Sequence, residues 1–173
     1  MAKKTRIVLI STGGTIEKTY DESDGSLANK ESVIREYLIS KLRLPYLNID
    51  IYPIMAKDSL DMDDKDRNFL VENIRLYQKQ GDPILILHGT DRMAKSAEYC
   101  LENLDKVEVP IIFTGGMKPL EISNSDSLQN VSEALMALQL VEPNIYISFH
   151  SKLFNVPGTR KNSHLRTFER YEI

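Results

Sequence analysis

Two threonines of this sequence, Thr15 and Thr90, follow apolar runs and could act as nucleophiles. Thr15 ends the segment STGGT, and Thr90 stands beside Asp91 in the segment HGTD. A threonine hydroxyl is a weak nucleophile unless a base takes its proton. A lysine could be this base only if its pKa falls well below the ordinary value of about 10.4. Asp91 could orient such a lysine, so these residue types are compatible with amide or acyl-transfer chemistry.

Polar and glycine-rich segments follow the other apolar runs in the same way. Ser59 lies in the segment KDSLDM, Gly116 lies in GGMKP, and Lys161 lies in a later polar stretch. In an open parallel sheet, ligands bind beyond the carboxyl ends of the strands. Glycines at such an edge let the backbone approach a ligand and offer N–H groups. Together these segments suit a small polar zwitterion.

The strands that must position these segments are visible as short apolar runs. Five runs predict strands at residues 7–10, 49–55, 84–88, 110–114 and 145–150. The first, third and fourth are continuous rather than alternating, as expected for a sheet that is covered on both faces. Pro53 is compatible with a strand only at the edge of the sheet.

Apolar residues at helical spacing fill the gaps between these strands. The predicted helix faces are Val33, Ile34, Tyr37, Leu38 and Leu42; Phe69, Leu70, Ile74 and Tyr77; Met93, Ala97, Cys100, Leu101 and Leu104; and Val131, Leu135, Met136, Leu138 and Gln139. Alternating strands and helices predict right-handed crossovers. We therefore expect an α/β fold, a three-layer sandwich with a mostly parallel, Rossmann-like sheet of about five strands. The polar residues 19–29 are expected to form a mobile loop.

The overall composition excludes several classes of protein. The 173 residues correspond to one domain at about 150 residues per domain, and the net charge of −3 gives no general attraction to nucleic acid or anionic membranes. The single cysteine, Cys100, excludes an internal disulfide framework and indicates a reducing compartment. The run at residues 7–10 is too short for a signal peptide, and no run approaches the ~20 residues of a membrane span. We expect a soluble, cytoplasmic protein.

Structural roles are the simpler interpretation of several other reactive residues. STGGT lacks the lysine of a phosphate-binding loop and the glycine spacing of a dinucleotide site. His88, His150 and His164 lie far apart without metal-ligand spacing, and His88 is expected to pack at a strand end. Cys100 should be a buried thiol, and the acidic residues 62–66 should begin a helix. No metal and no organic cofactor is expected.

The order of the motifs supports a more specific interpretation. TGGTI, DSLDM, HGTD and GGMKP resemble signatures of the amino-terminal domain of bacterial-type L-asparaginases, including the glutaminase-asparaginases. The similarity covers essentially this whole chain, but only about half of a family chain. It implies a single amino-terminal-type domain over residues 1–173, with the family's carboxyl-terminal domain absent. In the family, the second domain of a neighbouring protomer helps to bind the substrate amino group, so its absence should lower affinity and specificity.

The resemblance also implies a catalytic role for each matching residue. Thr15 resembles the nucleophile that becomes acylated, and Tyr20 resembles the tyrosine that hydrogen-bonds it. Thr90 resembles the second catalytic threonine, and Asp91 resembles the acid that binds the substrate amino group. Lys161 resembles the lysine that pairs with Thr90 and Asp91.

Substrate-binding positions are carried over in the same way. Ser59 resembles the residue that holds the substrate α-carboxylate, and Gly116 resembles the loop residue beside the side-chain amide. Gly14 and Gly89 match glycines of the binding edge. Backbone N–H groups near Gly116 and Thr90 would stabilise the oxyanion.

Three positions depart from the family pattern. Leu60 stands where many members have a polar residue that helps to hold the substrate, and Arg92 stands where a threonine is usual. Arg160 competes with Lys161 for the position of the catalytic lysine, because this stretch is shorter than the family pattern.

Three functions compete on these observations. The resemblance implies an amidohydrolase that hydrolyses L-asparagine to L-aspartate and ammonia through an acyl-enzyme on Thr15. An alternative is a non-catalytic or weakly active module that binds an amino acid. A third is a different amidase or acyl-transfer enzyme that uses the two threonines. The expected partners are a small amide or amino acid and a second copy of the chain, as a homodimer or higher homo-oligomer, with no nucleic acid and no membrane.

Overall fold

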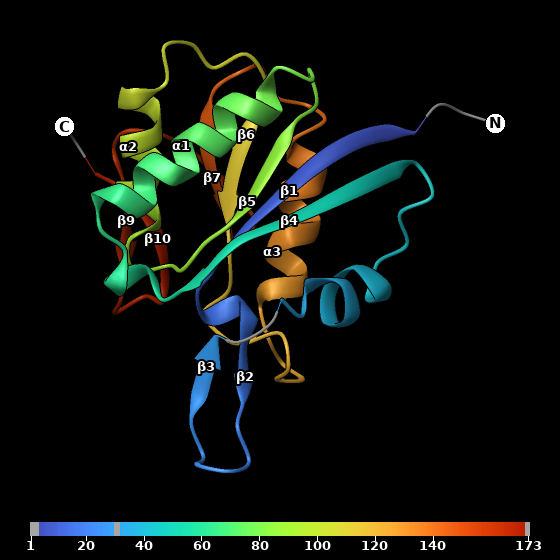
Figure 1. Cartoon of the computed structure of the whole chain (residues 1–173), viewed down its shortest axis with the longest axis vertical. Helices are drawn as coiled ribbons and strands as arrows, with labels where there is room; N and C mark the ends of the chain where they lie inside the picture. The colour runs from blue at the N-terminus through green and yellow to red at the C-terminus, as the bar shows by residue number, and fades with distance from the viewer. Residues whose placement is uncertain (1–3, 30–31, 172–173) are drawn as a thin grey trace.

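A six-stranded sheet forms the centre of the structure, a computed structural model that describes residues 4–29 and 32–171 (Figure 1). Its strands are β1 Thr5–Gly13, β4 Leu47–Lys57, β5 Ile84–Leu87, β6 Ile111–Thr114, β7 Ile145–Phe149 and β8 Lys152–Asn155. The strand order is β4-β1-β5-β6-β7-β8. All neighbours are parallel except β7 and β8. The predicted mostly parallel α/β sheet is confirmed, with β8 as an additional edge strand.

Helices cover both faces of this sheet (Figure 1). Their bounds are α1 Asp64–Gln78, α2 Met93–Asn103 and α3 Ser127–Ala137, with short turns η1 Thr15–Glu17, η2 Ile34–Leu38, η3 Ile39–Lys41 and η4 Ser59–Asp61. The helices α1 and α2 pack on one face, and α3 and the π-helical turn η2 pack on the other. In β1, Val8 and Ile10 join the first core, whereas Ile7 and Leu9 join the second. Successive strand residues point to opposite faces, so two covered faces produce a continuous apolar run.

The apolar face predicted for the helix that contains Cys100 is confirmed in α2, which packs on the sheet. Met93, Ala97 and Cys100 of α2 are fully buried. At the start of α1, Asp63 and Asp66 form a capping box, so the acidic cluster does begin a helix. Pro53 lies in β4, which is an edge strand. Proline has no backbone N–H, and an edge strand has one side on which no neighbouring strand needs that donor.

Two details of the helix predictions are wrong. Phe69 of α1 is 51% exposed and Met136 of α3 is 60% exposed, because each is adjacent in sequence to the residue that faces the sheet. Neighbouring residues on a helix are rotated by about 100°, so both cannot lie at the centre of one buried face. The segment at 33–42 is not one helix, since it divides into η2 and η3 and turns extended at Leu42.

Two hairpins carry no apolar signal in the sequence. β2 (Lys18–Tyr20) pairs with β3 (Leu27–Asn29) where the composition predicts a loop, and this hairpin projects away from the sheet (Figure 1). β9 (Thr159–Asn162) pairs with β10 (Thr167–Arg170) near the end of the chain. Among residues 4–29 and 32–171, every helix is too short or too polar to cross a bilayer.

Candidate active site

The loops that follow β1, β4 and β5 touch at the carboxyl edge of the sheet. Gly14 donates its backbone N–H to the carbonyl oxygen of Lys57, the last residue of β4, at 2.8 Å. Gly14 has a φ of 81°, and a Cβ at this position would collide with the backbone of Gly89. Glycine alone combines this left-handed conformation with so close an approach. The TGGT and HGTD motifs are therefore pressed together through their glycines.

Ser59 belongs to the same group of contacts. A Cβ on Gly89 would lie 2.6 Å from the Ser59 hydroxyl oxygen, which accepts the backbone N–H of Arg92 at 3.3 Å. The side chain of Asp58 caps the turn that begins at Ser59. Lys18 forms an ion pair with Asp58 at 2.6 Å, and this contact holds the pKa of the Asp58 carboxyl below its ordinary value. The buried Ser59 hydroxyl is thus fixed beside the HGTD motif.

The loop after β6 completes the edge. Leu120 donates its N–H to the carbonyl oxygen of Ile16 at 3.0 Å, which links the GGMKP loop to the TGGTI loop. A Cβ on Gly115 would collide with the carbonyl oxygen of His88. The next residue, Gly116, is buried. Four motifs that are far apart in sequence therefore meet at one sheet edge, as their positions after strands predict.

Lys161 connects the hairpin β9–β10 to the HGTD motif. Its side-chain nitrogen lies 2.8 Å from the hydroxyl oxygen of Thr90 and 2.9 Å from a carboxylate oxygen of Asp91. Arg160 points elsewhere and pairs with Glu169 at 2.8 Å. Successive residues of a strand point to opposite sides, so only one of the two cations can face the sheet edge. Of these two cations, Lys161 is the one that contacts the HGTD motif.

Tyr20 is the predicted site residue that the structure does not bring to the edge. It ends β2, its side chain is 54% exposed, and its N–H donates to the carboxylate of Glu121 at 2.8 Å. Its hydroxyl lies near Gly25, in the turn of the same hairpin. Thr15, by contrast, begins η1 directly after Gly14 and is partly exposed at the edge. The strand β2 that ends at Tyr20 belongs to the hairpin that projects away from the sheet (Figure 1).

The structural roles expected of two reactive residues are confirmed. His88 is fully buried with its Nδ1 2.8 Å from the carbonyl oxygen of Gly89, and burial lowers the pKa of its imidazole to about 4. Cys100 is fully buried in the core, and burial raises the pKa of its thiol. Within the described part of the chain, no three His, Cys, Asp or Glu side chains gather as metal ligands would.

Sequence reasoning overlooks one buried carboxylate beside the nucleophile candidate. Glu17, two residues after Thr15, is 4% exposed and accepts hydrogen bonds from the hydroxyls of Ser11 and Ser32. Burial raises the pKa of the Glu17 carboxyl above its ordinary value. It lines a cavity of about 260 Å³ with Gly13, Asn29, Ser32 and residues 53–56 of β4. An isolated glutamate in a polar segment is usually exposed, so no pattern marks this one.

The chain matches known proteins along nearly its whole length. The family model for "Asparaginase, N-terminal" matches residues 6–172. L-asparaginase 1 of Escherichia coli strain K12 is 32% identical over 169 residues, which cover 92% of this chain and 48% of that protein. The 60 kDa lysophospholipase of Mus musculus is 32% identical over 123 residues, which cover 69% of this chain and 21% of that protein.

The fold of this chain is also similar to that of a solved L-asparaginase structure. The structure of the thermostable L-asparaginase from Thermococcus kodakarensis superposes with a TM-score of 0.86 at 25% sequence identity, over 96% of this chain and 51% of that chain. The chain thus spans about half the length, or less, of the curated relatives it matches.

Proposed function

The chain belongs to the asparaginase family, and on this basis we propose that it is an amidohydrolase that converts L-asparagine to L-aspartate and ammonia. One observation carries the proposal furthest. The ammonium group of Lys161 contacts both the hydroxyl of Thr90 and the carboxylate of Asp91. A lysine that contacts both a hydroxyl and a carboxylate at the carboxyl edge of a parallel sheet is suited to moving protons and to holding an amino acid.

The reaction that we propose has two halves. The Thr15 oxygen attacks the side-chain amide carbon, and the hydroxyl proton that it loses is passed to the amide nitrogen. Ammonia then departs with this proton when the C–N bond of the tetrahedral intermediate breaks, which leaves the acyl group on the Thr15 oxygen. Water then hydrolyses the Thr15 ester and releases aspartate. The Thr90 hydroxyl, 2.8 Å from the Lys161 nitrogen, is the route by which we expect protons to move. Backbone N–H groups near Gly116 and Thr90 would stabilise the oxyanion in both halves.

The remaining site residues would hold the ends of the amino acid. The Ser59 hydroxyl is buried beside the HGTD motif, where it would donate to the substrate α-carboxylate. The Asp91 side chain is 39% exposed, so one of its oxygens can reach the substrate amino group while the other contacts Lys161. Gly14 and Gly89 allow the backbone to approach the ligand without side-chain obstruction.

Ammonia release tests this function. The purified protein would be incubated at high concentration with L-asparagine, L-glutamine, D-asparagine and a peptide amide, and ammonia would be measured against a sample without protein. We expect release from L-asparagine above the others, because Ser59 and Asp91 select both charged ends of a short amino acid. Release from none of these amides would contradict the proposal.

A binding module is the second candidate. Leu60 is 59% exposed at the edge, where a polar residue would contact substrate, and the Tyr20 hydroxyl lies near Gly25 in the turn of its own hairpin. These two departures favour a site that holds an amino acid without turning it over efficiently. Calorimetry with L-aspartate distinguishes the two candidates, since binding without ammonia release from any amide supports the module.

We also propose that the chain forms a homodimer. The Asp91 side chain, which is proposed to hold the substrate amino group, is 39% exposed, and Leu60 is exposed at the same edge. A second copy would cover this edge by two-fold symmetry, the commonest arrangement of soluble oligomers. Sedimentation at micromolar concentration tests the assembly, and a monomer there would contradict it.

A further inference from the structure

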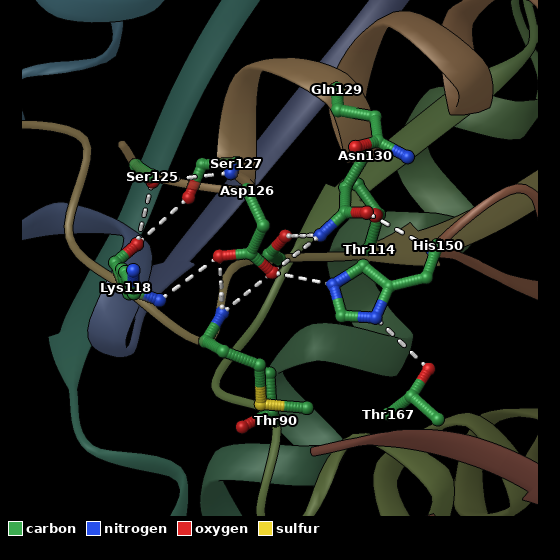
Figure 2. Close-up of polar contacts among 12 residues, drawn as sticks. Thr90, Thr114, Lys118, Ser125, Asp126, Ser127, Gln129, Asn130, His150 and Thr167 are labelled. Carbon is green, nitrogen blue, oxygen red and sulfur yellow. Dashed lines mark hydrogen bonds and ion pairs between the residues drawn. The ribbon is translucent and has the colours of Figure 1, made fainter. Parts of the chain in front are cut away.

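Asp126 lies immediately before α3 and holds the backbone of the loop at residues 115–119. Its carboxylate oxygens lie 2.9 and 3.0 Å from the backbone nitrogen of Met117, and one oxygen accepts the N–H of Lys118 at 3.1 Å (Figure 2). Burial opposes ionisation of this carboxyl, but the N–H of Met117 and the ring of His150 outweigh it and keep its pKa below the ordinary value. A charged carboxylate therefore anchors the loop that contains Gly116.

His150 anchors Asp126 in turn. The Nε2 atom of the imidazole lies 2.9 Å from a carboxylate oxygen of Asp126, and its Nδ1 atom lies 3.0 Å from the hydroxyl of Thr167 (Figure 2). Thr167 is the first residue of β10, and the next residue, Phe168, is paired with Lys161 across the hairpin. One imidazole thus bridges the loop after β6 to the hairpin that carries Lys161.

The backbone conformation of the turn after β7 orients the His150 imidazole toward Asp126. His150 and Ser151 both have positive φ, 47° and 63°, which non-glycine residues adopt only when their surroundings hold them there. Side chains of α3 provide that support. Asn130 accepts the N–H of His150 at 3.0 Å, and Glu133 accepts the N–H of Ser151 at 2.7 Å.

We propose that Asp126 and His150 are positioning residues that fix the loop at 115–119 relative to Lys161. This inference rests on the proposed amidohydrolase function, in which N–H groups near Gly116 and the Lys161 side chain act on opposite sides of one amide. Neither Asp126 nor His150 touches the reacting atoms. They act by holding two catalytic elements, delivered by different strands, at a constant separation, and reaction rates are sensitive to displacements of about 1 Å.

Amide hydrogen exchange tests the positioning directly and needs no activity. Exchange at individual amides would be followed by NMR in the unaltered protein, in Asp126→Asn and in His150→Ala. We expect the amides of Met117 and Lys118 to exchange at least about tenfold faster in both variants, because their acceptor is weakened or released. The amide of Ile86, in the central strand β5, should keep its rate.

Two further variants separate positioning from general destabilisation. His150→Gln can still donate to Asp126 and should restore slow exchange at Met117 and Lys118, whereas His164→Ala, at an exposed histidine, should change nothing. An equal acceleration at every amide, or no acceleration at Met117 and Lys118, would overturn the inference. If Asp126→Asn does not fold, His150→Ala still tests the positioning. The His150 side chain is 31% exposed, so we expect its removal to leave the fold intact.

Kinetics then connects the clamp formed by Asp126 and His150 to catalysis. In His150→Ala we expect kcat for the best amide to fall about 10- to 100-fold, with KM and the Kd for aspartate changed less than about threefold. His150→Gln should recover most of kcat. Faster exchange with an unchanged kcat would overturn the catalytic role of the clamp. An unaltered protein without activity would instead contradict the proposed function, and the exchange measurement alone would still decide whether the clamp holds the loop.

Discussion

The side-chain nitrogen of Lys161 lies 2.8 Å from the hydroxyl oxygen of Thr90, a residue 71 positions earlier in the chain. The contact is partly shielded from water, since 19% of the Lys161 side chain is exposed. Partial exclusion of water strengthens the interaction of the ammonium with the carboxylate of Asp91. The hairpin β9–β10 therefore contributes a charged group to an edge that is otherwise built by the loops after β1, β4, β5 and β6.

The first prediction compares the two neighbouring cations. Lys161→Met keeps much of the side-chain length but removes the group that contacts Thr90, so kcat for ammonia release should fall about 10²- to 10⁴-fold. Arg160→Met is the matched control, because Arg160 pairs with Glu169 on the other side of the strand. It should retain activity within about threefold, since an exposed ion pair contributes little. Equal losses in both variants would contradict the assignment of Lys161.

The second prediction concerns the nucleophile. Thr15→Val keeps the branched shape and deletes the hydroxyl, so turnover should become undetectable. The free energy of unfolding should change by only about 1 kcal/mol, because a partly exposed loop hydroxyl contributes little to stability. Thr5→Val, at an exposed position at the start of β1, should leave turnover unchanged. Ammonia release and urea denaturation measure the two effects, and full activity in Thr15→Val would remove Thr15 from the mechanism.

The third prediction separates binding from chemistry. Ser59→Ala deletes the buried hydroxyl that is proposed to donate to the α-carboxylate, so the Kd for L-aspartate should rise about tenfold or more. Thr15→Val should bind aspartate normally, since it retains both ends of the amino-acid site. Ser132→Ala is the control, because the exposed Ser132 hydroxyl donates to the carbonyl oxygen of Leu128 within α3. Titration calorimetry gives the three constants, and an unchanged Kd in Ser59→Ala would place the carboxylate elsewhere.

The buried part of the fold could be predicted from the sequence, whereas the polar part could not. The run at residues 7–10 is apolar at every position because both faces of β1 are covered, and this pattern is unambiguous. The strand β9 has the sequence TRKN, in which no apolar period exists. It forms because it pairs with β10 and because Phe168 packs into the first core. Such tertiary causes leave no local signal.

The same distinction applies to the candidate site. Positions after strand ends place Thr15, Ser59 and Thr90 at one edge, so their gathering follows from topology alone. The choice between Arg160 and Lys161 requires the register of a polar hairpin, which spacing does not supply. His150 could be interpreted only as an isolated histidine, because its partners come from α3 and β10.

His88 is the residue whose burial has the clearest consequence for stability. Its imidazole is fully buried and its pKa is lowered to about 4, against 6.5 in the unfolded chain. Between these two values the unfolded state binds more protons than the folded state, so acid favours unfolding. The stabilisation is complete above pH 6.5 and is lost as the pH falls toward 4.

The last prediction follows from this difference in proton binding. Between pH 7.5 and pH 4.5, protonation of His88 in the unfolded chain should remove about 2–3 kcal/mol of the free energy of unfolding. In His88→Gln the side chain at position 88 does not titrate, so the free energy of unfolding of this variant should fall by about 2–3 kcal/mol less over the same interval, even if the variant is less stable throughout. Carboxylates with lowered pKa, such as Asp58 and Asp126, contribute equally to both proteins and cancel in the comparison. Urea denaturation of the two proteins at both pH values measures the difference, and parallel losses would show that the buried imidazole does not govern the acid sensitivity of the fold.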